Sequence, residues 1–349
     1  MRILASTETY VDNLHLGYVE PREYVTEYGV PIKRLPYVKV GTHFSTIKFR
    51  KYPHVYEEIA AFAPDVILSH DLGYWSVLDV IRYKKDHPEV KLYADTHTAY
   101  ENSGTNWLSL HVLHRMFYRP LIQKGLPYLE KYWYVGVGEK KFSRGVYNVP
   151  ESLMECYPLG GVLFSPDEYE EKRARRRVEL GLEPDELLLV HTGKLGPLKR
   201  TKELLQAFAD IPELNAKLII IGSIPEETKS DILPLVNLDS RVEYLGWKSA
   251  ADLMEYLCAA DLYCQPGSGS ATLQNAICCG CPVVAFPIDS YVELLDRGQF
   301  FWVQTQNDME DVFRNIAKDS DLLSSKTKGA WSCAREILDY RKLAARLYQ

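Results

Sequence analysis

Short apolar runs alternate with helix-like stretches along this 349-residue chain, and this alternation limits the possible fold most strongly. The apolar runs are about five residues long, as strands are, and the stretches between them carry helical spacing. Parallel strands need a crossover, usually a helix, so the pattern predicts βαβ units and parallel sheets. The strand candidates of the first half are 1–6, 32–37, 65–69, 91–95, 132–137 and 154–158. Those of the second half are 186–191, 217–222, 242–246, 261–265, 282–286 and 300–304.

Two such series predict an α/β protein with two doubly wound domains, which also suits a chain too long for one core. The join is expected where Gly160, Gly161 and Pro166 interrupt the periodicity. The predicted domains are therefore 1–160 and 161–330, followed by an amphipathic helix within 331–349. The other helix candidates are 54–63, 74–85, 168–180, 202–210, 250–259, 273–279 and 290–296. The arginine-rich run 168–180 is interpreted as a solvated helix face.

Composition excludes several classes of protein. The net charge of −6 disfavours broad nucleic-acid binding, so an anionic ligand would need a local basic cluster. No apolar run reaches the roughly 18 residues of a spanning helix, and the N-terminus enters a strand without a signal-peptide core. The seven cysteines, including the run 278–281, lack the paired spacing of a zinc site. We therefore expect a cytoplasmic protein with reduced thiols and no metal.

A glycine-serine loop follows the strand candidate 261–265. Its residues Gly267, Ser268, Gly269 and Ser270 lack bulky side chains, so a ligand can approach the backbone closely. The helix that follows points unpaired N–H groups and its positive dipole end at the same place. This arrangement favours a phosphate or pyrophosphate, although an ordinary strand–loop–helix crossover explains the pattern as well.

A basic loop follows the strand candidate 186–191. Lys194 and Lys199 are predicted to lie on this strand-to-helix loop, where open α/β sheets bind their ligands. Lysine is a compact charge that suits phosphate oxygens and a leaving diphosphate. Together the basic loop and the glycine-serine loop predict two walls of one anion site.

The order of motifs resembles GT-B glycosyltransferases of family GT4. Residues 190–208 are similar to the family's "GR(L)…K-G…LL-A-F" signature, and 275–285 resemble "E-A-M-A-C-G-x-P-V-V-A". Further similar segments are 64–71, 92–97, 217–222, 242–247 and 257–263. The resemblance implies the GT-B fold, with two Rossmann-like domains facing across a cleft. It also implies that the last helix crosses back to the N-terminal, acceptor-side domain.

The resemblance assigns roles to individual residues. It implies that Lys194 and Lys199 hold the donor's diphosphate, and that His97 lies near the anomeric carbon or the donor sugar. The implied catalytic residues are His97, Lys194 and Lys199. The implied donor-binding residues are Gly17, Lys194, Lys199, Trp247, Gly267, Ser268, Gly269, Ser270, Ala271, Thr272, Leu273 and Asn275. His70 and Asp71 are interpreted as structural.

The chain departs from the family at its paired glutamates and at its first phosphate loop. The family's paired glutamates, eight positions apart, correspond to Gly267 and Asn275. Glycine cannot contact the transferred sugar as glutamate does, whereas asparagine can still accept one hydrogen bond from a ribose hydroxyl. The first domain lacks the usual glycine pair of a phosphate loop, and Gly17 is the candidate replacement.

The implied activity is transfer of a sugar from a nucleoside-diphosphate sugar, expected to be a UDP-sugar, to a glycan or glycolipid acceptor. This is an EC 2.4 reaction, expected to retain the anomeric configuration without a metal; the nucleotide sugar is a substrate, so no cofactor is implied. Two alternatives stay open. One is an inverting GT-B transferase with His97 as the base, and the other is a degenerate subunit that binds a nucleotide or partner without transfer.

The basic, aromatic run 106–134 is the candidate contact with the acceptor. It combines Trp107, Met116 and Phe117 with Arg115 and other basic residues. Such a helix can lie on an anionic membrane surface or hold a lipid-linked acceptor. The alternative is a core helix with a solvated outer face. The membrane interpretation implies a cytoplasmic protein in peripheral contact with the inner face of the membrane, acting in polysaccharide or glycolipid biosynthesis.

Overall fold

The computed structural model describes residues 1–11, 15–319 and 321–348 of the chain. It divides into two compact units, Met1–Tyr157 and Pro158–Gln349, so the predicted join at residue 160 lies just inside the second unit. The segment 331–349 also groups with the second unit. Its predicted packing on the first domain stays a prediction.

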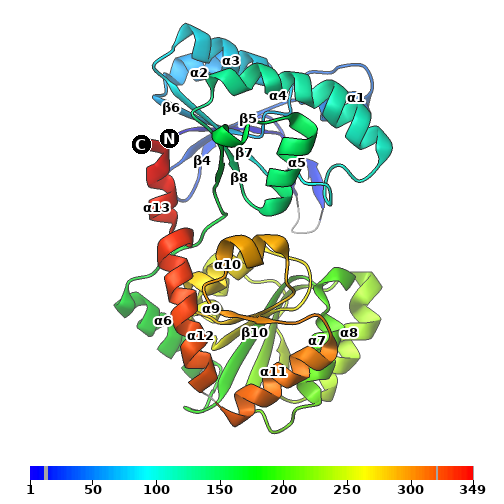
Figure 1. Ribbon diagram of the computed structural model, residues 1–349, viewed down its shortest axis with the longest axis vertical. Helices are drawn as coiled ribbons and strands as arrows, with labels where there is room; N and C mark the ends of the chain where they lie inside the picture. The colour runs from blue at the N-terminus through cyan, green and yellow to red at the C-terminus, as the bar shows by residue number, and fades with distance from the viewer. Residues whose placement is uncertain (12–14, 320, 349) are drawn as a thin grey trace. The chain divides into compact units, whose positions relative to one another are not determined.

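The second unit is built on one parallel six-stranded sheet (Figure 1). Its strands are β10 (Leu187–Lys194), β11 (Ala216–Ser223), β12 (Val242–Tyr244), β13 (Leu262–Gln265), β14 (Val283–Ala285) and β15 (Phe300–Trp302). Their spatial order is β12-β11-β10-β13-β14-β15. The order reverses between β10 and β13, and doubly wound sheets bind ligands beyond the carboxyl ends of the strands at such a switch point.

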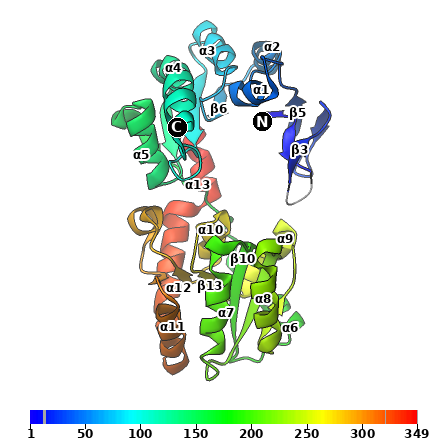
Figure 2. The same ribbon diagram turned by 90° about the vertical axis from the view of Figure 1, so that its right-hand side faces the viewer.

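Helices cover both faces of this sheet, and each face has its own core. One face packs against α7 (Thr201–Ala209), α8 (Glu226–Leu238) and α11 (Gln306–Lys318), of which α7 and α8 are seen in front of the sheet in Figure 2. The other packs against α6 (Pro166–Glu179), α9 (Ala250–Ala259), α10 (Ala271–Cys278), η5 (Tyr291–Leu295), α12 (Asp321–Cys333) and η6 (Ala334–Leu338). Both faces are therefore buried, as the apolar runs predict.

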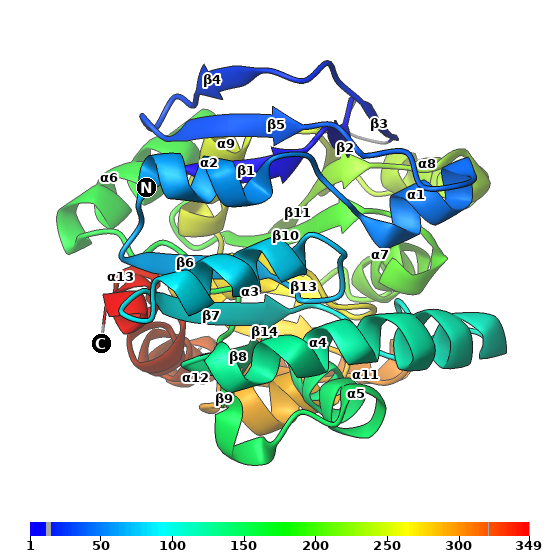
Figure 3. The same ribbon diagram turned by 90° about the horizontal axis from the view of Figure 1, so that it is seen from above.

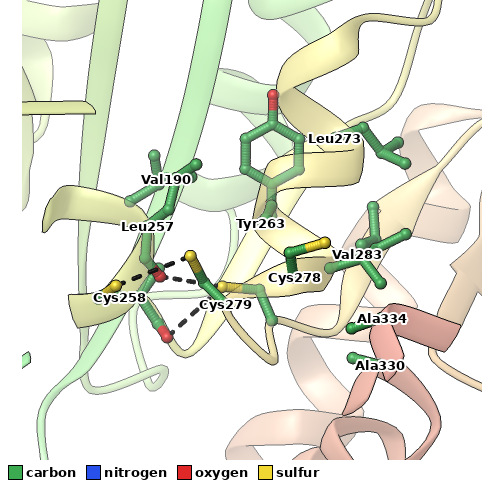
Figure 4. Packing of buried hydrophobic residues seen from close by; sticks show 14 of the residues in the cluster. Val190, Leu257, Cys258, Tyr263, Leu273, Cys278, Cys279, Val283, Ala330 and Ala334 are labelled. Carbon is green, nitrogen blue, oxygen red and sulfur yellow. Dashed lines mark hydrogen bonds between the residues drawn. The ribbon is translucent and has the colours of Figure 1, made fainter. Parts of the chain in front are cut away.

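Cysteines take part in the second core as small apolar side chains. Cys258, Cys278 and Cys279 are buried beside Val190, Tyr263 and Val283 (Figure 4). The seven cysteines form no disulfide among the described residues.

The C-terminal helix differs from its prediction. The chain enters a helix at Asp321 and runs through α12 and η6 to Leu338, where Asp339 interrupts it with an extended conformation. Asp339 then caps α13 (Tyr340–Ala345), and η7 (Arg346–Tyr348) follows. The interruption lets Asp339 bridge to Gly161 beside α10.

The first unit contains a parallel four-stranded sheet, in the order β6-β7-β8-β9. Its strands are β6 (Val66–His70), β7 (Lys91–Thr96), β8 (Lys131–Tyr134) and β9 (Met154–Cys156). Apolar residues of α2 (Val55–Phe62), α3 (Val77–Asp86), α4 (Arg119–Gly125) and α5 (Val137–Tyr147) form its core. Figure 3 shows α3 and α4 running along these strands.

The start of the chain departs from the predicted doubly wound pattern. β1 (Ile3–Ser6) pairs with β5 (Pro31–Leu35) in a separate sheet, where β4 (Glu23–Val25) joins antiparallel, and β2 (Glu8–Tyr10) pairs with β3 (Leu16–Tyr18). Lys33 and Arg34 lie on β5 and bind Glu58 and the Ser6 carbonyl. Burying both faces of such a strand would cost too much, so β5 is not a central strand of the parallel sheet.

Several first-unit boundaries also differ. α1 (His43–Phe49) and the 3₁₀ turns η2 (Leu126–Tyr128) and η3 (Glu151–Leu153) were not predicted. The single helix expected over 106–134 is η1 (Leu108–Tyr118), then α4 and η2, with the last four residues in β8. Pro120 and Pro127 lie at the first turns of α4 and η2, where the missing N–H is tolerated.

Candidate functional site

The glycine-serine loop and the basic loop meet at the switch point of the second sheet. Ser268 N–H donates to the Leu198 carbonyl over 2.8 Å. A Cβ added to Gly267 would lie 2.0 Å from the same carbonyl oxygen, so only glycine permits this contact. The two segments predicted as walls of one site are therefore adjacent.

Lys199 joins these two segments directly. It ends the short turn η4 (Pro197–Lys199), and its Nζ donates to the carbonyls of Ser268 and Gly269 over 2.9 and 3.1 Å. Its side chain crosses Gly193, where a Cβ would meet Lys199 Cε at 3.3 Å and φ is +134°. Burial lowers the pKa of Lys199 to about 8.

Lys194 lies differently from its prediction. It is the last residue of β10 and is paired with Ser223 of β11 rather than placed on the loop. Its side chain is exposed. The strand continues farther than expected because Gly193 and Gly222 cross closely, with a Cβ on Gly222 falling 1.9 Å from the Gly193 oxygen.

Arg200 is a site residue that sequence reasoning missed. Its Nη1 donates to the Gln304 carbonyl at 2.9 Å and to the Pro266 carbonyl at 3.4 Å, at the base of the glycine-serine loop. Its backbone is left-handed, with φ of 56°. The sequence did carry a signal for this residue, because Arg200 follows Lys199 at the position where the GT4 signature has glycine.

A buried polar network supports the loop from below, and it was also missed. Gln265 is fully buried; its Oε1 accepts from Tyr263 Oη and Ser270 Oγ at 3.0 and 3.2 Å, and its Nε2 donates to the Ser268 carbonyl at 2.5 Å. Thr192 Oγ1 lies 2.7 Å from Tyr263 Oη. Satisfied buried networks of this kind hold a backbone in one conformation.

The helix that follows the loop begins at Ala271, one residue after Ser270. Two of the N–H groups expected to face a ligand at this helix end have protein partners in the structure. The Ser270 N–H donates to Tyr291 Oη at 3.2 Å and the Leu273 N–H to the Ser270 carbonyl at 3.3 Å. Leu273 is fully buried in the core. At this helix end Ala271 is exposed and Thr272 is half-buried.

Asn275 and its neighbour Gln274 face the start of the second unit. Gln274 Oε1 accepts from the Gly160 N–H at 2.7 Å. Asn275 Oδ1 lies 2.9 Å from the position that a Cβ on Gly161 would occupy. Asn275 is half-buried, so its amide lies against this segment on the same helix as Thr272.

Trp247 follows β12 at the same carboxyl edge of the sheet. Gly246, just before it, takes φ of 68° and accepts from the Gly222 N–H at 2.9 Å. The Trp247 side chain is exposed.

In the first unit, His97 lies within a second polar cluster. It follows β7, and its Nε2 is 3.6 Å from Asp95 Oδ2, while His70 Nδ1 is 3.0 Å from Asp95 Oδ1. Burial acts to raise the pKa of Asp95, but the neighbouring imidazoles of His70 and His97 outweigh it and hold that pKa well below its ordinary range. The hydrogen bond to Asp95 raises the pKa of His70.

The two residues interpreted as structural behave differently. The Asp71 carboxylate accepts from the backbone N–H groups of Leu72 and Gly73 and from Thr98 Oγ1, so Asp71 is structural as expected. The His70 side chain, by contrast, is 74% exposed, so it does not fill the core.

Gly17 does not form a phosphate loop. It lies in β3 opposite Thr9 of β2, and a Cβ on it would fall 2.8 Å from Val11 Cγ1. The close approach of Val11 explains glycine here without a ligand.

Comparison with known proteins identifies the second unit. The protein-family model described as "Glycosyl transferases group 1" matches residues 172–326, which include the basic loop and the glycine-serine loop. Residues 172–326 belong to the group 1 glycosyltransferase family. This glycosyltransferase domain holds all of the predicted donor-binding residues except Gly17.

Curated relatives resemble part of the chain. N-acetyl-alpha-D-glucosaminyl L-malate synthase of Bacillus anthracis is 27% identical over 152 residues, which are 41% of this chain and 39% of the relative. D-inositol 3-phosphate glycosyltransferase of Mycobacterium sp. (strain KMS) is 31% identical over 123 residues, covering 32% and 27% of the two chains. The chain thus matches well under half the length of these relatives.

Solved structures resemble both units. Anabaena Alr3699/HepE in complex with UDP has a TM-score of 0.66 and 16% identity, covering 92% of this chain and 86% of that one. WaaG, a glycosyltransferase involved in lipopolysaccharide biosynthesis, has a TM-score of 0.59 and 18% identity, covering 93% and 88%. The chain accordingly has the α/β fold of GT-B glycosyltransferases, with the glycosyltransferase domain as its second unit.

Proposed function

We propose that the protein transfers a sugar from a UDP-sugar to a glycan or glycolipid acceptor. The observation that carries this proposal is the contact of Lys199 with the glycine-serine loop at the switch point of a doubly wound sheet. Lys194, Lys199 and the start of α10 place positive charge and N–H groups at one edge of this sheet, which suits a diphosphate. HepE, which has a similar fold, binds UDP.

The proposed reaction breaks the bond between the anomeric carbon and the β-phosphate oxygen, which keeps the electron pair. The acceptor hydroxyl oxygen forms the new bond to carbon, and its proton passes to the departing diphosphate. Charge on the diphosphate grows as the bond breaks, so Lys194, Lys199 and the α10 N-terminus stabilise the transition state more than the ground state. These groups supply the charge stabilisation without a metal ion at the leaving group.

Lys199 must exchange partners during donor binding. In the free protein its ammonium is bound by the Ser268 and Gly269 carbonyls. Phosphate oxygens are stronger acceptors for an ammonium than neutral carbonyls, so we expect the donor to draw Lys199 from the loop. Donor binding and the conformation of the loop are thereby coupled.

His97 keeps two proposed roles, and each predicts a different product. In a retaining transferase it contacts the donor sugar, and in an inverting one it takes the acceptor's proton with Asp95 beside it. Retention leaves the anomeric configuration of the donor, whereas inversion reverses it. An NMR spectrum of the product therefore decides between the two.

The exposed face of η1 is proposed to bind the acceptor's lipid or a membrane surface. Trp107, Leu108 and Met116 are 66%, 66% and 71% exposed, with Arg115 exposed between them. This outer face is apolar, unlike the solvated face of the alternative interpretation. Apolar side chains beside basic ones are the pattern of a peripheral helix on an anionic leaflet.

Within the described residues, no helix has the length and apolar character needed to cross a bilayer. A membrane acceptor would place the protein at the cytoplasmic face, in glycolipid or polysaccharide synthesis.

The position of Gly267 bears on the degenerate alternative. The Cβ of a glutamate at position 267 would clash with the Leu198 carbonyl oxygen at 2.0 Å. The family's first glutamate therefore could not be accommodated without moving η4. The absence of this glutamate thus goes with a backbone contact that only glycine permits, next to Lys199. We take this arrangement as support for an active transferase with a rebuilt sugar contact.

The test combines UDP binding with diphosphate release. We expect UDP to raise the melting temperature of the wild type, and a panel of UDP-sugars to include one that yields UDP and a transferred or hydrolysed sugar. Lys194→Ala/Lys199→Ala should lower the turnover by about 100-fold or more. The matched control is Lys202→Ala, because Lys202 is an exposed lysine of the following helix that pairs with Asp231.

Three outcomes separate the interpretations. UDP binding with release of UDP from one sugar donor supports the transferase. UDP binding without release from any nucleotide sugar, even at high enzyme concentration, favours the degenerate subunit. Equal UDP binding by the wild type and the double lysine variant would overturn the diphosphate assignment.

A further inference from the structure

Three side chains with metal-ligand atoms meet at the carboxyl edge of the first unit's parallel sheet. His70 ends β6, and Asp95 on β7 is its register partner. His97 follows two residues after Asp95, so the alternation of side chains along a strand brings both to the same face. One ligand atom from each of the three lies within 4.8 Å of the other two.

The three groups converge without being fully bonded to one another. His70 Nδ1 lies 3.0 Å from Asp95 Oδ1 and is hydrogen-bonded to the carboxylate. His97 Nε2 is 3.6 Å from Asp95 Oδ2, which is too long for a hydrogen bond. The His97 imidazole thus lies close to a carboxylate that is already hydrogen-bonded to His70. Such an approach without a direct bond is expected of two side chains that bind the same cation.

The distances suit a tetrahedral ion. Zinc bonds of 2.0–2.2 Å to nitrogen and oxygen put neighbouring ligand atoms roughly 3.3 Å apart. Measured to the same carboxylate oxygen, Asp95 Oδ2, His70 Nδ1 lies at 3.2 Å and His97 Nε2 at 3.6 Å, on either side of this value. The remaining separation is at most 4.8 Å. The His70 side chain is 74% exposed, so its ring can move by the roughly 1 Å that closure requires.

The ligand types restrict the ion further. Two imidazole nitrogens and one carboxylate oxygen suit Zn²⁺ and neighbouring transition metals, whereas Mg²⁺ and Ca²⁺ prefer oxygen-only sets. Three protein ligands also leave a fourth position open, and the exposure of His70 and His97 lets solvent reach it.

We propose that His70, Asp95 and His97 form a binding site for one divalent transition-metal ion of the zinc type. The register of β6 and β7 places the carboxylate between the two imidazoles, and the exposed edge gives the ion its entry path. This site uses none of the residues proposed to bind the diphosphate.

The site has a consequence that rests on the proposed function. A metal bound to His97 Nε2 takes the lone pair of this nitrogen and excludes a proton from it. The imidazole nitrogen can then neither accept nor donate a hydrogen bond to the donor sugar or the acceptor. We therefore expect zinc to inhibit the transferase reversibly, with activity restored by a chelator. Metal binding itself does not depend on the protein being a transferase.

The test is a Co²⁺ and Zn²⁺ titration of the tag-free, full-length protein after removal of metal by a chelator. We expect one equivalent of Co²⁺ to give a visible absorption band that one equivalent of Zn²⁺ abolishes. Asp95→Asn keeps the side-chain volume and His70→Ala removes one ligand; each should weaken binding at least 10-fold. Circular dichroism and melting temperatures show whether each variant is folded.

His87→Ala is the matched control. His87 Nδ1 lies 3.5 Å from Glu89 Oε1, which makes it an exposed histidine–carboxylate pair in the same unit, outside the three-residue cluster. Its removal should leave the stoichiometric band unchanged. If His70→Ala and Asp95→Asn, both folded, bind Co²⁺ as the wild type does, or if the wild type binds no stoichiometric metal, the site is disproved.

Zinc sensitivity of the activity provides a separate measurement. The ratio of turnover with and without zinc should fall in the wild type and stay near one in His70→Ala, whatever the basal rate of that variant. If the protein binds one Co²⁺ as described but transfers no sugar, the metal site stands and the proposed function fails. If it transfers sugar and binds no metal, the reverse holds.

Discussion

Lys199 shows how one residue links packing to charge. Its chain lies over Gly193, and its ammonium is bound by two loop carbonyls. Burial lowers its pKa to about 8 from the ordinary 10.5. The folded state therefore disfavours the charged form, and this group's contribution to stability rises with pH between about 8 and 10.5.

UDP affinity should consequently depend on pH. As pH rises through about 8, Lys199 loses the charge that attracts the diphosphate, and we expect the affinity to fall by up to about tenfold per pH unit above 8. His191 lies near Lys199, but burial lowers its pKa to about 4, so it stays neutral in this range. Calorimetry from pH 7 to 9.5 measures the effect. Lys199→Arg stays charged and corrects for titration of the ligand; an identical pH profile for this variant would contradict the assignment.

Gly267 gives a second prediction at the residue scale. Gly267→Ala places a Cβ 2.0 Å from the Leu198 oxygen, so the loop must move away from η4. We expect a loss of about 1–3 kcal/mol in the free energy of unfolding and weaker UDP binding. Urea titration and calorimetry measure both.

Gly196→Ala is the control for this prediction. Gly196 lies just before η4 with φ of −73°, and the nearest atom to an added Cβ is 3.8 Å away. We expect a change within about 0.5 kcal/mol. Equal effects of the two substitutions would show that the Gly267 contact is unimportant.

At the scale of elements, α6 is held by its arginines rather than merely solvated by them. Arg173 binds Asp261 and donates to the carbonyls of Cys258, Ala259 and Ala260 at the end of α9. Arg177 binds the other Asp261 oxygen at 2.8 Å. The interpretation of 168–180 as a solvated face is wrong for Arg173 and Arg177, because charge spacing on one helix does not reveal partners on another.

Arg173→Ala should therefore destabilise the second unit. It removes three hydrogen bonds to carbonyls at a helix end and leaves one Asp261 oxygen without its donor. The side chains of Arg173 and Asp261 are only 24% and 15% exposed. We expect a loss of about 3 kcal/mol, measured by urea denaturation. Arg314→Ala removes an exposed pair with Asp311 and should cost under about 0.5 kcal/mol. Similar losses in both variants would contradict a pinning role for Arg173.

At the scale of the whole molecule, the apolar face of η1 predicts peripheral membrane binding. We expect the wild type to float with anionic phosphatidylglycerol vesicles and less with phosphatidylcholine. Leu108→Glu/Met116→Glu should lower the partition coefficient at least about tenfold, because two exposed apolar side chains no longer enter the bilayer.

Val178→Glu is the matched control for vesicle binding. Val178 is 80% exposed on α6 of the other unit, so a new charge there should not change flotation. If neither vesicle type carries the wild type, the face of η1 is reserved for a soluble acceptor or a protein partner.

The sequence by itself determined the α/β class, the second unit's parallel strands and the two loops of the proposed donor site. These follow from local signals: five-residue apolar runs, helical spacing between them, and glycines or lysines at strand ends. The motif order added the GT-B fold, which the solved structures confirm, and the group 1 glycosyltransferase family, which the family model confirms for residues 172–326. Short antiparallel strands such as β2, β3 and β4 were missed because a strand of three residues is too short to show an alternating pattern.

The tertiary structure alone decided which atoms meet. The hydrogen bonds of Lys199 to the loop, of Arg173 to the end of α9 and of His70 to Asp95 each join residues at least 25 positions apart. Strand register and order fix such contacts, and both depend on packing across the whole sheet. Residue types predicted an anion site, but only the fold placed the lysine on the loop that it was expected to face.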